Sequence, residues 1–354
     1  MIRAVALADR LAMPALKLLA AINVLFFVTF LLVAAIAVGQ ARAEAPACTG
    51  SDLYEALKTE NPAAAGNIDA AARATPNGSG LLWKVEKAGT APSYLFGTMH
   101  MTDPRVTALP PAAQAAFDAS ATVVIETTDV LDQAKMMAAI MQKPELMMFT
   151  DQTTLKSLLS PEDAVAVEAA LSERGIPLAS VLKMKPWMLS AMVALPACEM
   201  ARKAAGLPVL DVKLAKDAEA AGKTLRGLET VTDQLEAMAS LPMEFHIRGL
   251  VDTLKLGDRM DDVVETMISL YLKGEVGAIW PLFREVLPDG GAEEGYAAFE
   301  EVMVTARNKT MAAEADPILK EGGAFVAVGA LHLPGAEGIV EILRRSGYSV
   351  TAVD

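Results

Sequence analysis

The stretch SYLFGTMH (residues 93–100) has a close counterpart in AFVAVGALH (residues 324–332) near the other end of the chain. Each reads as an apolar β-strand followed by glycine, two further residues and histidine. Glycine at a strand end lets the backbone turn sharply, and open α/β sheets bind ligands at the carboxyl ends of their strands. The chain has three histidines, and this pattern contains two of them. We therefore predict that His100 and His332 share one site for a metal ion or for proton transfer.

Strand-like and helical segments alternate around these two runs. We expect the remaining strands at residues 81–86, 122–126, 208–211, 224–229 and 348–353. Alternation of this kind favours parallel strands joined by crossover helices, and the turn at residues 87–92 adds an antiparallel hairpin. The sequence thus predicts an α/β fold with a mixed central sheet of βαβ-like units. Large helical insertions are expected at about 131–205 and 232–295, within a single domain of residues 44–354.

The net charge of the chain is −13, from 44 acidic and 31 basic side chains. Phosphate binding requires clustered lysine and arginine. We therefore expect no nucleic acid among the partners, and a peptide or a small molecule as the substrate. The charge does not identify that substrate.

The N-terminus resembles an export signal. Basic residues at positions 3, 10 and 17 precede an apolar stretch, Leu18–Gly39, and Ala41-Arg42-Ala43 fits a small-x-small cleavage site. We predict that residues 1–43 are a signal peptide. The alternative is an uncleaved membrane anchor formed by residues 18–39. Both place the rest of the chain outside the cytoplasm, in the periplasm or the extracellular space.

Both cysteines, Cys48 and Cys198, lie in the part of the chain that would be exported. In an oxidising compartment two cysteines are more often paired than free. We predict a disulfide bond between them, with two separate thiols as the alternative.

Several polar residues could complete a site around the two histidines. Glu126 ends one expected strand and Glu229 ends another, so either carboxylate could be a metal ligand or a general base. Arg307 and Asn308 precede the last site strand on a helix. The arginine could stabilise a substrate carboxylate or an oxyanion, or could form a structural ion pair with either glutamate. His246 lies in a helical stretch and is interpreted as a structural or a surface residue.

These motifs resemble the TraB/GumN family, which includes the Tiki proteases of animals. The matching segments are GTMH at 97–100, Glu126, LKMKPW at 182–187, LET at 228–230, RN at 307–308 and GALHLPG at 329–335. The resemblance spans about residues 81–354. It implies a fold similar to the erythromycin-esterase/ChaN-like group and a protease activity that depends on a divalent metal ion.

The sequence and the resemblance together favour an exported metal-dependent hydrolase that acts on peptide bonds. His100, His332 and Glu126 are the expected ligands of a manganese, cobalt or zinc ion. Glu126 or Glu229 would act as base, while Arg307 and Asn308 would stabilise charge or orient a ligand. The alternative is a non-catalytic binding protein that holds a metal complex, haem or a small ligand in the same pocket.

Overall fold

The computed structural model describes residues 48–286 and 293–353, which belong to one compact unit, Ala47–Asp354. The predicted signal peptide or anchor lies outside the described residues. Among the helices that the structure describes, none is long and apolar enough to cross a membrane.

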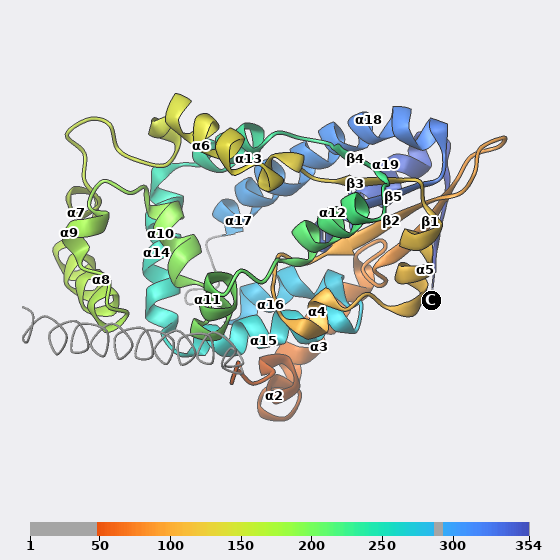
Figure 1. Cartoon of the computed structure of the whole chain (residues 1–354). Coiled ribbons are helices and arrows are strands. Elements are labelled where there is room, and N and C mark those ends of the chain that lie inside the picture. Colours follow the sequence, from red (N-terminus) through yellow and green to blue (C-terminus); the bar gives the residue numbers. More distant parts are fainter. Residues whose placement is uncertain (1–47, 287–292, 354) are drawn as a thin grey trace, which may run out of the picture. The chain divides into compact units, whose positions relative to one another are not determined.

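The centre of this unit is a six-stranded mixed sheet with the order β4-β3-β5-β2-β1-β6 (Figure 1). Its strands are β1 (Leu82–Glu86), β2 (Ser93–Thr98), β3 (Thr122–Ile125), β4 (Thr224–Gly227), β5 (Ala324–Gly329) and β6 (Ser349–Ala352). The pairs β2–β5, β5–β3 and β3–β4 are parallel, whereas β1 is antiparallel to both β2 and β6. The predicted mixed α/β fold is therefore confirmed.

The helices occupy the segments between these strands. They are α2 (Leu53–Glu60), α3 (Pro62–Ala74), α4 (Pro104–Thr107), α5 (Pro111–Ala119), α6 (Gln133–Gln142), α7 (Leu155–Leu158), α8 (Pro161–Glu173), α9 (Leu178–Val181), α10 (Pro186–Val193), α11 (Ala197–Ala204), α12 (Leu210–Ala220), α13 (Val231–Ser240), α14 (Met243–Leu256), α15 (Arg259–Leu272), α16 (Ile279–Val286), α17 (Glu293–Glu300), α18 (Ala306–Glu321) and α19 (Ile339–Arg345). Shorter helical turns are η1 (Thr128–Leu131), η2 (Pro144–Leu146), η3 (Val276–Ala278), η5 (Glu301–Thr305) and η6 (Ala330–His332).

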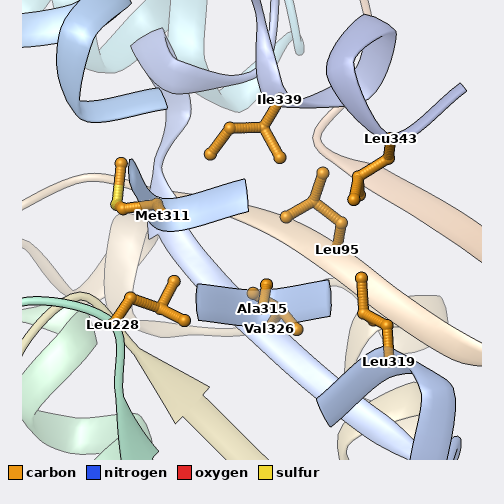
Figure 2. Close-up of a pocket in the computed structure, with 8 residues that line it drawn as sticks. All are labelled: Leu95, Leu228, Met311, Ala315, Leu319, Val326, Ile339 and Leu343. Carbon is orange, nitrogen blue, oxygen red and sulfur yellow. The ribbon is translucent and has the colours of Figure 1, made fainter. Parts of the chain in front are cut away.

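The strand β5 is buried on both faces, as its uninterrupted apolar sequence requires. Phe325 and Ala327 contribute to the core that also contains side chains of α5 and α12. Val326 and Val328 point to the opposite core, beside α18 and α19. Figure 2 shows this second core, in which Leu95 and Val326 of the sheet face Met311 of α18. The void there is about 10 Å³, barely one water molecule in size, so it is a packing gap and no substrate pocket.

The two predicted insertions are helical, and α14 of the second packs against the first to form a lobe with its own core. Side chains of α15 and α16, also from the second insertion, belong to the core of the sheet. Leu155, Leu171 and Leu189 come from the first insertion, and Leu250 comes from α14 in the second. In Figure 1 this lobe lies beside the sheet, with α10 and α14 adjacent. The sequence predicted the insertions but not their association.

One predicted strand is wrong, and the order of the strands was not predicted. Residues 208–211 do not form a strand, because α12 begins at Leu210 and includes Asp211 in its first turn. Pro208 and Val209 lead directly into this helix, so the short apolar run is a helix start. In addition, β2 and β3 are separated in the sheet by β5.

A disulfide bond joins Cys48 to Cys198 in α11, with a Cα–Cα distance of 5.4 Å. The predicted pairing is thus confirmed. The bond closes a loop with a sequence separation of 150 residues, and it is consistent with export to an oxidising compartment.

Candidate functional site

Four predicted site residues lie at one edge of the sheet, because they follow four parallel strands. His100 comes two residues after β2, and His332 ends the turn η6 directly after β5. Glu126 follows β3 immediately, and Glu229 comes two residues after β4. The carboxyl ends of β4, β3, β5 and β2 thus present two imidazoles and two carboxylates at the place where α/β sheets bind ligands.

The glycine of the second motif marks the point where these side chains converge. A Cβ atom at Gly329 would lie 3.1 Å from Glu126 Oε1, 3.4 Å from His332 Cδ2 and 4.0 Å from His100 Nε2. The Gly329 N–H also donates a 2.7 Å hydrogen bond to Glu126 Oε1. Gly329 has a φ of −51°, so glycine is needed here for space and not for an unusual backbone conformation. The two histidines therefore share one site, as the repeated motif predicts.

Each histidine is held through its Nδ1 atom. His100 Nδ1 lies 2.7 Å from Asp211 Oδ2, and an ionised carboxylate can only accept, so Nδ1 donates. His332 Nδ1 lies 2.6 Å from Asn308 Oδ1. The Asn308 amide nitrogen donates to the Glu337 carbonyl, which turns its oxygen toward the imidazole. Both rings therefore direct Nε2 toward the common site, and this atom is unprotonated whenever the ring is neutral.

The histidines differ in burial and in the charge of their partners. The side chain of His100 is 60% exposed, whereas that of His332 is 7% exposed. The Asp211 carboxylate raises the pKa of His100 to about 9. Burial lowers the pKa of His332 to about 4. At neutral pH the metal-free site thus contains one charged and one neutral imidazole.

Arg307 links the two glutamates. Its Nη2 donates to Glu126 Oε2 and to Glu229 Oε2, both at 2.7 Å, and its Nε donates to both Glu229 oxygens. Its Nη1 donates to the Met303 carbonyl at 3.1 Å and to His332 Nε2 at 3.4 Å. Every guanidinium nitrogen therefore has a hydrogen-bond partner within the protein. Arg307 thus forms the structural ion pair that the sequence analysis gave as an alternative to substrate binding.

Glu126 remains ionised although it is buried. Burial alone would raise the pKa of Glu126, but the positive charges around it, including Arg307, lower that pKa to about 2. Gln234 also donates to both glutamates, at 3.1 Å to Glu126 and 3.3 Å to Glu229. The site thus holds two carboxylates around one guanidinium group.

The helical segment before Arg307 has unusual geometry. The turn η5 is π-helical and runs directly into α18. Segments of π-helix within α-helices are frequent at functional sites. Here the π-turn contributes the Met303 carbonyl that accepts a hydrogen bond from Arg307 Nη1.

The donor chemistry of the site suits a divalent metal ion, but the ligands are not preassembled. Two Nε2 atoms and one carboxylate are a common ligand set, and the Nδ1 partners are of the kind that orient such ligands. Within residues 48–286 and 293–353, no group of three or more His, Cys, Asp or Glu side chains is arranged to hold a metal ion. The Arg307 guanidinium, which bonds Glu126 and His332, is the cation at this position.

The structure brings together all six residues that the sequence proposed for this site: His100, Glu126, Glu229, Arg307, Asn308 and His332. It adds Asp211 and Gln234, which the sequence analysis did not find. Asp211 was placed in an expected strand, and Gln234 lies in α13 without a motif around it. His246 is buried in α14, outside the site, which agrees with a structural role.

Comparison with known proteins gives the same assignment as the motifs. The zebrafish (Danio rerio) protein "Metalloprotease TIKI1" is 25% identical over 310 residues, which cover 76% of this chain and 62% of the relative. "Metalloprotease TIKI2" of the same species is 26% identical, with 76% of this chain and 60% of the relative covered. "Metalloprotease TIKI homolog" of Nematostella vectensis is 25% identical, with 78% and 68% covered. The chain thus spans about three fifths of the length of the zebrafish relatives.

No solved structure matches the chain significantly. The family comparison, in contrast, covers most of it and includes every strand of the sheet. Residues 81–352 match the TraB/PrgY/gumN family, and the chain belongs to that family.

Proposed function

We propose that the protein is an exported metal-dependent hydrolase that cleaves peptide bonds. The observation that carries the proposal is the convergence of His100, His332 and Glu126 on Gly329. The distant relatives named metalloproteases support the reaction class. The disulfide bond supports export, and similarity to the erythromycin-esterase/ChaN-like group stays a prediction.

In this proposal His100 and His332 bind the ion through Nε2, and Glu126 supplies the carboxylate ligand. The ion, when bound, would act as a Lewis acid toward the carbonyl group of the substrate. Asp211 and Asn308 would keep the imidazoles in the required tautomer. Manganese, cobalt and zinc all suit imidazole and carboxylate ligands, so the proposal does not select among them.

Glu229 is the carboxylate left to act as general base once Glu126 is a ligand. It lies on the adjacent strand end and shares Arg307 with Glu126. The weakest Arg307 contact is the 3.4 Å bond from Nη1 to His332 Nε2. When His332 Nε2 takes up its role as ligand, this N–H loses its acceptor and can donate to an oxygen of the substrate.

The test uses the purified protein, a library of peptides and added Mn²⁺, Co²⁺ or Zn²⁺. We expect cleavage only with metal, and we expect His100→Ala and His332→Ala each to abolish it. His246→Gln, on the helical lobe, is the matched control and should retain metal stoichiometry. Metal binding of wild-type affinity in the His100→Ala/His332→Ala double variant would refute the site. Metal or haem bound as purified, without cleavage of any peptide, would favour the binding-protein alternative.

A further inference from the structure

The carboxylate of Asp211 contacts the site directly, although Asp211 belongs to none of the sequence motifs. It lies in the first turn of α12, on an element that contributes no motif residue. Its Oδ2 bonds His100 Nδ1 at 2.7 Å, and its Oδ1 accepts from Thr98 Oγ1 at 2.5 Å. Asp211 thus contacts two residues of the first glycine-histidine motif.

Asp211 is nearly buried, and in the described part of the chain its ion pair is with His100 alone. The side chain is 10% exposed. Burying an ionised carboxylate is costly unless it is paired and hydrogen-bonded. No lysine or arginine of the described residues forms a salt bridge with it. His100 is therefore the charged partner of this carboxylate, and the Thr98 hydroxyl donates a further hydrogen bond to it.

The surroundings fix Asp211 from several directions. Thr98, the last residue of β2, donates its hydroxyl to Asp211 Oδ1. The Tyr271 hydroxyl donates to the Gly97 carbonyl at 2.9 Å, which holds the backbone of the same motif. The N-terminal position in α12 also favours a negative charge. These contacts place the carboxylate before any ligand arrives.

We infer that Asp211 is a positioning residue for His100: its carboxylate holds the Nδ1–H tautomer and so presents Nε2 to the common site. This inference rests on the proposed function, because a metal ligand requires an ordered imidazole with an unprotonated Nε2. Asn308 has the matching position for His332. The two histidines thus carry different orienting partners, one ionic and one neutral.

The first test reads the tautomer directly and needs no metal. The chain has three histidines, so protein labelled with ¹⁵N-histidine gives three resolvable imidazoles by NMR in metal-free alkaline buffer, where the rings are neutral. We expect His100 in the Nδ1–H form in the wild-type protein and mainly in the Nε2–H form, which unrestrained imidazole prefers, in Asp211→Ala. The His332 signals should not change.

The second test measures affinity for Co²⁺ by calorimetry. Loss of an orienting partner typically weakens metal binding about 10–100-fold, and we expect this for Asp211→Ala. Asp217→Asn is the matched control, because Asp217 lies on the same helix and pairs with Lys213 at the surface; it should bind as the wild type does. If Asp211→Ala does not fold, Asp211→Asn is measured in its place, and loss of the charged acceptor should weaken binding in the same direction.

An unchanged His100 tautomer with affinity within about twofold of the wild type would overturn the inference. A wild-type protein that binds no Co²⁺ would overturn the proposed metal site instead. In that case the tautomer measurement would still decide whether Asp211 positions His100.

Discussion

Replacement of Arg307 by methionine tests whether this residue is the cation that the metal-free site requires. The guanidinium donates at 2.7 Å to both Glu126 and Glu229, whose side chains are 7% and 3% exposed. Methionine fills a similar volume but removes the guanidinium that both carboxylates share. Removing one partner of a buried ion pair costs about 3–5 kcal/mol. We expect a loss of this size in the free energy of unfolding without metal.

A divalent ion should compensate for much of that loss. Any ligand that binds only the folded state stabilises it in proportion to its affinity, and a cation would restore the charge that Arg307→Met removes. The assay is urea unfolding followed by circular dichroism, with and without Mn²⁺ or Co²⁺. We expect the metal to stabilise Arg307→Met more than it stabilises the wild-type protein.

Two further variants make this result specific. Arg226→Met removes an exposed ion pair with Glu321, and we expect at most about 1 kcal/mol of change. Adding Glu229→Gln to Arg307→Met should recover part of the lost stability, because one unpaired carboxylate disappears. A loss below about 1 kcal/mol in metal-free Arg307→Met, equal to that of a surface pair, would refute the view that Arg307 offsets buried charge.

Three other perturbations follow from the structure. Substituting Cys48 and Cys198 by serine should lower the free energy of unfolding by about 2–5 kcal/mol; urea unfolding that matches the wild type would contradict this. Gly329→Ala would place Cβ 3.1 Å from Glu126 Oε1, so calorimetry should show Co²⁺ affinity about tenfold weaker with an unchanged circular dichroism spectrum; unaltered affinity would argue against convergence at this glycine. Burial opposes ionisation of Asp103, but hydrogen bonds and charge from its arginine neighbours lower its pKa below the ordinary 3.8. Its ionised form therefore stabilises the fold above that pH, and this contribution is lost as the pH falls. The free energy of unfolding should thus decrease less steeply with falling pH in Asp103→Asn than in the wild-type protein. An equally steep decrease in both proteins would exclude this contribution.

The elements that the sequence predicted best are those with a local signal. The runs that became β2, β3 and β5 are short, apolar and bounded by turn residues, and their order of alternation with helices implied parallel pairing. The carboxyl ends of those strands then located the two histidines and Glu126 without knowledge of the neighbours of each strand. For this reason the residues lie together even though β5 lies between β2 and β3.

What the sequence could not supply depends on contacts between distant residues. Asp211 and His100 are 111 positions apart, and no local pattern marks a carboxylate at a helix start as the partner of a histidine. The run Pro208–Asp211 is too short for periodicity to separate a strand from the first turn of a helix. The same limit applies to the packing of α10 against α14, since the apolar residues of one helix do not indicate which other helix will cover them.

The two glycine-histidine motifs are alike in sequence but not in environment, and the position of their strands explains why. The strand β5 lies between β3 and β2, so His332 emerges beside Glu126 and under α18, where it is buried and paired with the neutral Asn308. His100 follows β2, one strand farther from Glu126, and remains open to solvent while paired with the charged Asp211. A repeated motif has therefore produced a fixed inner imidazole and an accessible outer one. The burial of the strand ends thus decides which imidazole is open to solvent, because the His100 side chain is 60% exposed and that of His332 is 7% exposed.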